Sequence, residues 1–246
     1  MRFTGTSMKV FVTNFNNLEN GFRDMVAYFL RKGIVPTVLD NQSSYPPLLK
    51  FYEEMKNEIN LVNVGYNGNT WVFWQAGFNT EENCADHYIT TDGDCPPDPD
   101  CPEDLLEKMI AVLDEVPTAV KVSPGIRIDN IPDCYSRKAD AIGCQVGLTN
   151  ELPGTHPDIG DAAHKEIDVA GVKIYRSITD TTMTCWRAGY RGEGRLSTND
   201  WQVEQYRMEA PYLVKHVPWY ADSRVVSAEQ RFYRSSPKLN GPVFGL

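Results

Sequence analysis

The chain has 246 residues, of which 41% are hydrophobic and 23% are charged, as is ordinary for a globular protein with its own core. Its formal net charge of −9 and its isoelectric point near 5.0 argue against a generic binder of duplex DNA, which usually carries a basic face. No apolar run is long enough to span a bilayer, and the first ten residues lack a signal-peptide core, so we expect a cytoplasmic protein.

The first half of the chain alternates between strand and helix patterns. Strands are predicted at residues 9–13, 35–39, 60–64 and 88–91, and helices at 22–31, 45–55, 71–76 and 102–116. This alternation predicts right-handed βαβ units and a parallel sheet. Each strand is followed by a polar loop, so we expect the loops to gather at one sheet edge, where ligands bind; they are residues 13–17, 40–44, 65–69 and 92–94.

The second half has a weaker pattern. Residues 119–131 contain strand material, and strands are also predicted at 172–175 and 181–187. The stretch 134–165 is rich in Gly, Pro and Asp and is predicted to be a long loop. Residues 200–208 are predicted to form a helix, capped by Thr198 or Asn199. Because no repeat or linker is evident, we expect a single domain over residues 1–246.

Six cysteines are present, without any Cys-x-x-Cys pair. A chain of this size does not need disulfides, so we expect reduced thiols and no structural zinc.

Two carboxylates, Asp92 and Asp94, follow the predicted strand 88–91 directly. Buried side by side they repel each other and lose hydration, unless a cation joins them. Mg²⁺ or Mn²⁺ suits carboxylate oxygens and often completes its shell with substrate phosphates, which indicates a nucleotide-diphosphate site. The alternative is an acidic surface turn. Asp98 and Asp100 are interpreted as solvated turn residues or as helix N-terminal charges.

Several segments together resemble a GT-A-fold nucleotide-sugar glycosyltransferase, close to glycosyltransferase family 2 and the small viral GT-A enzymes. Asp92-Gly93-Asp94 matches the DXD motif of that fold in its place after a strand. The other matching segments lie between residues 8 and 222 and are VFVTNFNNLENGFRDMVAYFLRKG, VPTVLDNQSSYPPLLKFYEE, NVGYNG, RIDNIPD, TDTTMTCWRAG and YLVKHVPWYAD. The resemblance implies an α/β fold with a Rossmann-like, mostly parallel sheet flanked by helices and a smaller β element on the acceptor side.

The resemblance also implies a division of labour along the chain. Residues 8–116 would bind the nucleotide-sugar, most readily a UDP-sugar; residues 117–222 would form the acceptor and catalytic half; and residues 223–246 would be a tail. The residues implied to hold the donor are Thr13, Asn14, Asp40, Asn41, Ser43, Asn67, Gly68, Asn69 and Asp92. The metal, Mn²⁺ or Mg²⁺, would be held by Asp94, by Asp92 and by His216. The alternative for His216 is a packed histidine beside Pro218 and Trp219.

If the enzyme inverts the anomeric centre, as the resemblance favours, an acceptor hydroxyl needs a general base. Asp200 is the first candidate and Asp180 the second. The alternatives are a helix N-terminal charge for Asp200 and a turn-capping residue for Asp180.

Residues 132–167 depart from the family pattern, because they lack the expected tryptophan-glutamate helix, and this leaves the acceptor open. The leading hypothesis is a glycan or protein acceptor. The first rival is a hydroxymethylated base in DNA, supported by aromatic residues and by positive charges that would also suit a diphosphate: Trp186, Tyr190 and Trp201, with Arg187, Arg191 and Arg195. The rivals from other classes are a nucleotidyltransferase and a non-catalytic sugar-nucleotide binder.

Overall fold

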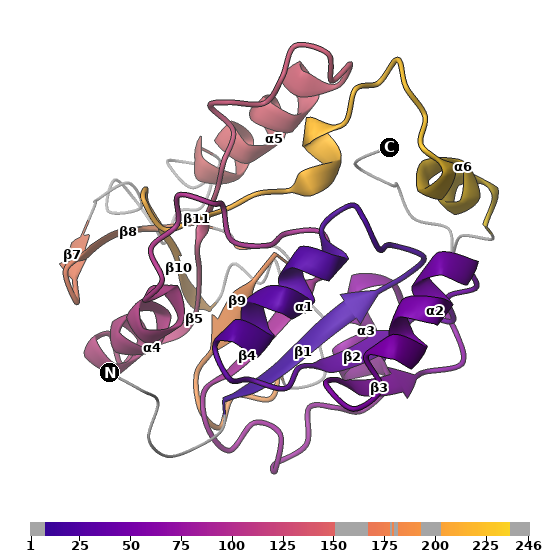
Figure 1. The fold of residues 1–246 in the computed structure, drawn as a ribbon. Helices are drawn as coiled ribbons and strands as arrows, with labels where there is room; N and C mark the ends of the chain where they lie inside the picture. Colours follow the sequence, from indigo (N-terminus) through magenta and orange to yellow (C-terminus); the bar gives the residue numbers. More distant parts are fainter. Residues whose placement is uncertain (1–7, 151–166, 178, 180–181, 193–202, 237–246) are drawn as a thin grey trace.

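The computed structural model describes residues 8–150, 167–177, 179, 182–192 and 203–236 (Figure 1). The fold is a mixed α/β fold in which helices flank a large sheet. Its helices are α1 (Phe22–Arg31), α2 (Pro46–Glu54), α3 (Val72–Gln75), α4 (Leu105–Glu115), α5 (Lys138–Asn150) and α6 (Ala228–Ser235), with 3-10 turns η1 (Asn69–Trp71) and η3 (Val217–Tyr220). None of the helices in these ranges has both the length and the apolar character needed to cross a membrane.

The strands of the described residues form one large sheet and one two-stranded sheet. They are β1 (Lys9–Asn14), β2 (Thr37–Asp40), β3 (Asn60–Asn63), β4 (Tyr88–Asp92), β5 (Ala119–Ser123), β6 (Gly125–Ile126), β7 (Ile167–Val169), β8 (Val172–Arg176), β9 (Thr184–Trp186), β10 (Glu204–Met208) and β11 (Leu213–Val214). The large sheet has the order β3-β2-β1-β4-β9-β5-β10-β8-β7, and β6 pairs with β11.

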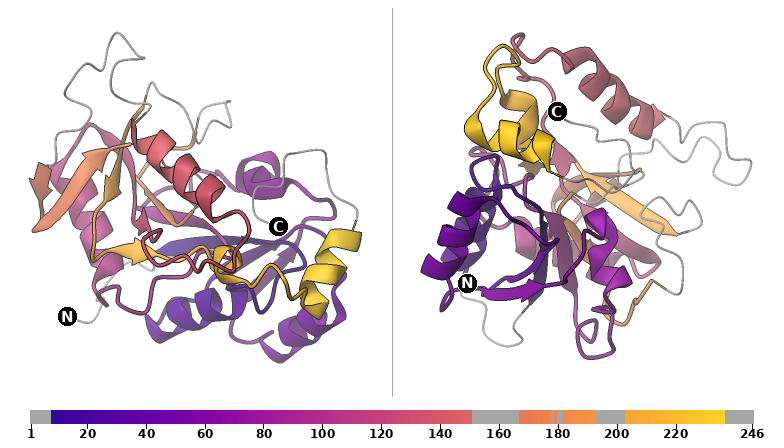
Figure 2. Two further views of the ribbon diagram at one scale, coloured as in Figure 1. Left: turned by 90° about the horizontal axis from the view of Figure 1, so that it is seen from above. Right: turned by 90° about the vertical axis from the view of Figure 1, so that its right-hand side faces the viewer.

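The first four strands of that order are parallel throughout, as predicted. They are linked by helices that cover both faces, with α1 and α2 on one side of the sheet and α3 on the other (Figures 1 and 2). The first face carries the larger core, where Val10, Val12 and Val38 pack under α1 and α2. The second carries a smaller, mostly aromatic core around Phe11, Phe73 and Trp186. Burying these apolar faces fixes the register of the strands and hence the position of their polar ends.

The second half of the chain differs from the prediction in two places. Residues 204–208 form strand β10 between β5 and β8, so the predicted helix over 200–208 is wrong for its described part. Gln205 and Arg207 lie on that strand and are both buried, so the apolar alternation that marks a strand is missing from the sequence. The stretch 134–165 is not a loop throughout, because it contains α5, whose apolar residues form no stripe in the sequence.

A short ribbon of three chain segments lies beside the end of β4. Residues 94–98 run antiparallel to residues 213–217, through backbone hydrogen bonds from Val217 to Asp94, from Lys215 to Pro96 and from Asp98 to Leu213. On its other side β11 pairs in parallel with β6, and the bond from Arg127 N to Val214 O extends this pairing. We call residues 94–98, 125–127 and 213–217 the ribbon.

Candidate functional site

The polar ends of β1, β2, β3 and β4 meet at one edge of the sheet. Asn14 pairs in register with Asp40, and Asp40 with Asn63, while Thr13 pairs with Asp92. Since all four strands are parallel, the loops after them emerge together, which confirms the predicted convergence. This edge is the candidate site.

Asp40 is buried at this edge and has hydrogen-bond partners on both carboxylate oxygens. The Tyr52 hydroxyl of α2 donates to Oδ1 at 2.9 Å, and the backbone N–H of Ser43 donates to Oδ2 at 2.8 Å. Asn14 Nδ2 donates to the same Tyr52 hydroxyl at 2.9 Å. Burial, and next the charge of Asp40, raise the pKa of Tyr52, so the hydroxyl stays protonated and keeps donating. Asp40, which is predicted to bind the nucleoside, therefore also holds the loop after β2 and helix α2 together.

Asn41 ties the β2 loop to the β3 loop. Its side-chain amide donates to Asn69 O at 3.0 Å, and its carbonyl accepts from Gly68 N at 3.2 Å. Within the second loop Asn67 Oδ1 accepts from Asn69 N at 2.9 Å. The structure thus brings together four of the residues predicted to hold the donor, and it places Gly68 inside and Asn69 at the surface.

Asn16 is a residue of this edge that sequence reasoning did not single out. Its side-chain oxygen accepts from the N–H groups of Ser44 and Tyr45, and its own N–H donates to Ser43 Oγ at 2.8 Å. Asn16 has φ of +50°, a left-handed conformation that asparagine tolerates better than most residues. An asparagine inside a polar strand-end loop was the available signal, because such side chains commonly bind nearby backbone groups.

The turn Asp92-Gly93-Asp94 lies close against β1 and α1. Gly93 donates its N–H to Thr13 O at 3.0 Å. A Cβ at Gly93 would lie 2.9 Å from the Phe22 ring and 3.1 Å from Asn14 Oδ1, so only glycine fits between the two aspartates. Packing therefore requires a glycine at position 93. From this turn the chain continues at Asp94 into the ribbon.

The ribbon brings His216 to Asp94 across more than a hundred residues of sequence. His216 Nε2 lies 3.5 Å from Asp94 Oδ2, and the imidazole packs on Trp219 with ring centroids 4.5 Å apart. Cys95, which is fully buried, places its Sγ 3.3 Å from Asp94 Oδ1. Among the described residues, Asp94, Cys95 and His216 form the one group of three whose potential ligand atoms all lie within 4.8 Å of one another.

This group fits a divalent cation in its donor chemistry. A carboxylate oxygen and an imidazole nitrogen face each other, and both kinds of atom bind first-row divalent metals. His216 Nδ1 is buried without a hydrogen-bond partner in the described part of the chain, so the ring leaves Nε2 as its accessible nitrogen. Asp92 is not a member of the group, although it lies two residues from Asp94. Cys95 was not predicted as a neighbour; its adjacency to Asp94 in the sequence was the signal available.

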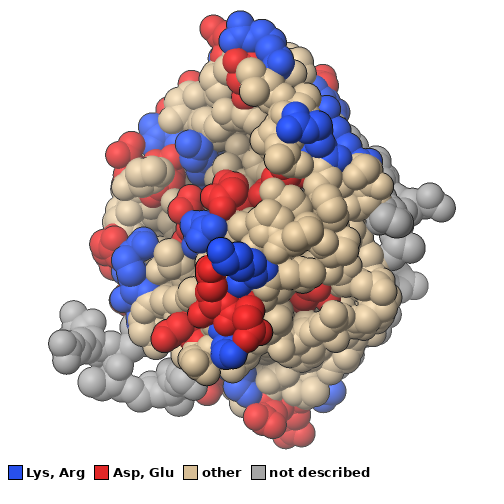
Figure 3. Space-filling model, turned by 45° about the vertical axis from the view of Figure 1, so that its right-hand side comes forward, with Lys and Arg blue, Asp and Glu red and all other residues tan. Residues whose placement is uncertain are grey.

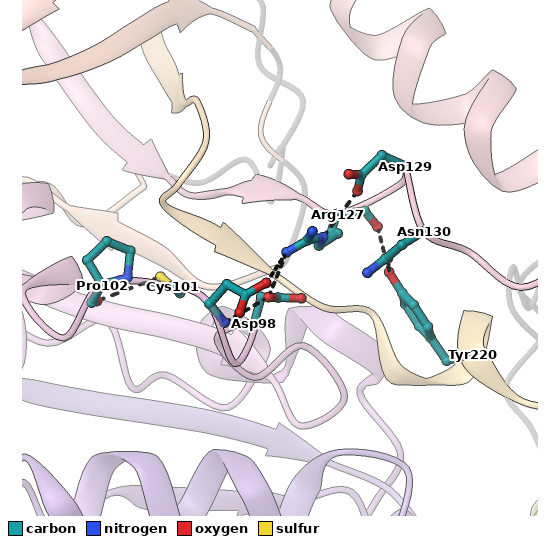
Figure 4. A network of polar contacts seen from close by, with 8 residues as sticks. Asp98, Cys101, Pro102, Arg127, Asp129, Asn130 and Tyr220 are labelled. Atoms are coloured by element: carbon teal, nitrogen blue, oxygen red, sulfur yellow. Dashed lines mark hydrogen bonds and ion pairs between the residues drawn. The ribbon is translucent and has the colours of Figure 1, made fainter.

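A network of ion pairs between side chains holds the ribbon together (Figure 4). Arg127 Nη1 lies 2.9 Å from Asp98 Oδ1 and 3.0 Å from Asp100 Oδ2, and its Nε lies 3.1 Å from Asp129 Oδ1. The Asp98 side chain is only 5% exposed, so its interpretation as a solvated turn residue is wrong. Asp98 is instead the buried carboxylate that fixes Arg127 across the ribbon, while the Asp100 side chain is 80% exposed, as its interpretation as a solvated turn residue predicts. The backbone oxygen of Arg127 accepts from the Tyr220 hydroxyl at 3.2 Å.

The two candidate bases, Asp180 and Asp200, lie outside the described residues, as do Arg195 and Trp201. Arg187 does not face a ligand site, because its guanidinium donates to the backbone oxygens of Leu113, Val116 and Ala119 at the end of α4 and the start of β5. Arg191 donates to Asn79 O.

The features that favoured a DNA acceptor are weaker in the structure. Trp186 is buried in the smaller core, where its indole N–H donates to Thr90, so it offers no stacking surface to a base. On the face in Figure 3, Lys and Arg side chains lie in separate groups among Asp and Glu side chains. Neither observation matches the basic, aromatic-lined groove that single-stranded nucleic acid requires.

No protein-family model matches the chain, and no curated protein sequence matches it. Among solved structures, the crystal structure of S. aureus TarS 1-349, a staphylococcal glycosyltransferase, is similar to the chain with a TM-score of 0.42 and 14% sequence identity. The match covers 74% of this chain and 47% of that chain, so this chain spans about half the length of TarS 1-349. At this TM-score the likeness identifies neither a family nor an activity.

Proposed function

We propose that the protein is a metal-dependent glycosyltransferase that moves a sugar from a nucleotide-diphosphate donor to an acceptor hydroxyl. One observation carries the proposal. The polar loops after β1, β2 and β3 meet at the sheet edge where Asp94 and His216 face each other at 3.5 Å. Ligands of open α/β sheets bind at this edge, and a carboxylate–imidazole pair beside it suits a metal that binds a diphosphate.

Each side of the site has a part in this reaction. The loops that contain Asp40, Asn41 and Asn69 would hold the nucleoside, with a UDP-sugar as the expected donor. Asp94 and His216 would hold Mn²⁺ or Mg²⁺, with Asp92 beside them reaching the metal or the ribose. When bound, the metal supplies Lewis-acid stabilisation of the negative charge that builds on the leaving diphosphate.

The acceptor half completes the proposal. Transfer with inversion requires a base that takes the proton from the acceptor hydroxyl as the anomeric carbon passes through an oxocarbenium-like state. We assign this role to Asp200 first and to Asp180 second, on the resemblance given above. We propose a glycan or a protein as the acceptor; the burial of Trp186 argues against DNA.

The direct test is release of free nucleoside diphosphate from UDP-, GDP- and dTDP-sugars by the whole chain with Mn²⁺. The reaction should need an acceptor, stop with EDTA, and transfer labelled sugar to a glycan or a protein. Transfer to hydroxymethylated DNA would instead identify the protein as a DNA-modifying glycosyltransferase. Release of pyrophosphate from a nucleoside triphosphate would indicate a nucleotidyltransferase, and donor binding without release would indicate a non-catalytic binder.

A further inference from the structure

Helix α6 docks on the loop that follows β1, although it lies in the segment predicted to be a tail. Glu229 of α6 is buried and accepts hydrogen bonds from the backbone N–H of Glu19 at 2.9 Å and of Asn20 at 3.2 Å. The Asn20 side chain donates to the same carboxylate. Because a buried carboxylate needs donors in place of water, these bonds anchor α6 to the β1 loop.

Asn16 joins the end of α6 to the loops after β1 and β2. Its Nδ2 donates to Ser236 Oγ at 3.0 Å just after α6, and its Oδ1 accepts from the N–H groups of Ser44 and Tyr45. Phe232 of α6 packs on Tyr45 with ring centroids 5.1 Å apart. The helix therefore contacts both of the loops that are expected to hold the donor. Figures 1 and 2 show α6 beside α2 at this end of the molecule.

A continuous path of hydrogen bonds leads from Ser236 through Asn16 to Asp40. The Asn16 N–H donates to Ser43 Oγ at 2.8 Å, and the Ser43 N–H donates to Asp40 Oδ2 at 2.8 Å. Asp40 is one of the residues predicted to bind the nucleoside. Because each bond on this path fixes the geometry of the next, a change in the docking of α6 can reach the strand ends at the candidate site.

Helix α6 depends on these contacts for its position. It has eight residues, and an isolated helix of that length is unstable in water. Its first turn is satisfied by a capping box, in which Ser227 Oγ accepts from Gln230 N and Ser227 N donates to Gln230 Oε1. The cap favours the helix, whereas Glu229 ties it to the β1 loop. Loss of the Glu229 carboxylate should therefore weaken the docking of α6 and leave the sheet folded.

We infer that Glu229 and Asn16 are positioning residues of the donor site, because the docking of α6 through them holds the loops after β1 and β2 in the conformation that binds the nucleotide. This inference rests on the proposed function, since it needs a nucleotide at this edge. Such coupling is reciprocal, so docking raises the affinity for the nucleotide and a bound nucleotide favours the docked helix. An anchor with a structural role alone would change stability and leave the affinity unchanged.

The first test is Glu229→Gln, which removes the charge and replaces one accepting oxygen with an amide group. Binding of UDP, GDP and dTDP is measured by calorimetry with Mn²⁺, well below the melting temperature of each variant. The affinity for the nucleotide that binds best should fall about tenfold, because the apparent affinity falls with the fraction of molecules whose loops are held. Glu54→Gln, at an exposed position of α2, makes the same change of charge and should bind as the wild type does.

The second test is Ser236→Ala, which removes the acceptor of Asn16 Nδ2. Ser236 follows the helix, so this variant decides the question alone if Glu229→Gln does not fold. We expect its affinity for the same nucleotide to fall about threefold, as for the loss of one neutral hydrogen bond. Ser235→Ala is the matched control, because Ser235 is the neighbouring serine and is exposed, and it should bind as the wild type does.

Hydrogen exchange of the wild type measures the coupling in the other direction. Binding of the same nucleotide with Mn²⁺ should slow amide exchange in α6, but not in α4, which packs on β5 in the other half of the sheet. If the wild type binds nucleotide while the folded variants bind within about twofold of it, or while exchange in α6 stays unchanged, the inference is wrong and the proposed function stands. If no nucleotide binds the wild type with Mn²⁺, both are wrong.

Discussion

The two sides of the candidate site differ in what their polar groups already bind. On the loop side, Asp40 and Asn41 are hydrogen-bonded to groups of the protein itself, within residues that lie close along the chain. On the ribbon side, Asp94 and His216 come from distant parts of the chain, and the potential ligand atoms of their cluster face one another. The hydrogen bonds on the loop side are of the kind that stabilise a folded loop. The atoms that face one another on the ribbon side are of the kind that bind a metal ion.

Because of this difference, we expect substitutions on the loop side to lower stability and substitutions on the ribbon side to lower activity. Where polar side chains are satisfied internally, removing one leaves buried donors without partners and lowers the free energy of unfolding. Where a carboxylate faces an imidazole beside Cys95, removing one is expected to cost the fold little and to take one ligand from the proposed metal site. Substitutions on the two sides are therefore expected to have opposite signatures.

The largest effect is expected on the ribbon side from Asp94→Ala. Loss of the carboxylate should lower metal-dependent turnover about 1000-fold, equivalent to about 4 kcal/mol of transition-state stabilisation. The melting temperature should stay within a few degrees of the wild type. Asp86→Ala, an exposed residue two positions before β4 and therefore at the other edge of the sheet, is the control and should retain activity. Full activity of Asp94→Ala would contradict the assignment of the acidic turn.

His216→Ala should weaken the metal rather than abolish turnover. We expect the Mn²⁺ concentration for half-maximal activity to rise about tenfold, with recovery at high Mn²⁺, because one ligand of several is lost. The chain offers a matched control in His87, whose Nε2 lies 3.1 Å from Asp114 Oδ1 beyond the other end of β4. His87→Ala should leave the Mn²⁺ requirement unchanged. An equal shift in both variants would show that His216 is not a metal ligand.

Asp40→Ala tests the loop side, where stability is expected to fall. The Tyr52 hydroxyl and the Ser43 N–H would lose their acceptor in a buried place, which costs about 2 kcal/mol of unfolding free energy. Urea denaturation measures this loss. Asn63→Ala, an exposed residue paired in register with Asp40, should cost about 0.5 kcal/mol or less. Equal costs for the two variants would mean that the loop network adds nothing to the fold.

Tyr220 gives the smallest effect, and it depends on pH. Burial, followed by the charges of Asp98 and Asp129, raises the pKa of Tyr220 from 10 to about 12. The unfolded chain therefore loses this proton first, so the stability linked to Tyr220 is complete below pH 10 and disappears between pH 10 and 12.

Tyr220→Phe removes both the titrating hydroxyl and its hydrogen bond. At pH 8 we expect it to be about 1 kcal/mol less stable than the wild type. The gap should close as the pH rises through 11. A gap that is constant over this range, measured by urea denaturation at each pH, would show that the Tyr220 hydroxyl is not held against Arg127 of the ribbon.

Much of the parallel half of the fold follows from its sequence, because its strands are apolar and their polar residues stand at the ends. The helix over 22–31 and the edge that gathers Asn14, Asp40 and Asp92 could be predicted in this way. The partners of Asp40 could not, since Tyr52 reads as an apolar helix residue in the sequence and only packing shows its hydroxyl at the strand end.

In the other half of the sheet, the strands predicted at 172–175 and 181–187 are confirmed as β8 and β9, whereas β10 was mistaken for part of a helix. Lys121 and Arg207 are buried on β5 and β10. These strands therefore have polar residues at buried positions, where an alternating pattern would have apolar ones. Those side chains are satisfied by contacts across long sequence separations, such as Arg207 with Gln145 of α5. The ribbon also depends on such contacts, because nothing near Arg127 in the sequence shows that Asp98 would pair with it.

We propose that the two sides of the site together bind a nucleotide-sugar donor and its metal. The most direct measurement is the melting temperature of the wild type with UDP-, GDP- and dTDP-sugars, each with Mn²⁺, with Mg²⁺ and with EDTA. We predict a rise with one donor when metal is present and none with EDTA, since a ligand that binds the folded state stabilises it by mass action. The absence of a metal-dependent shift with every donor would contradict the account.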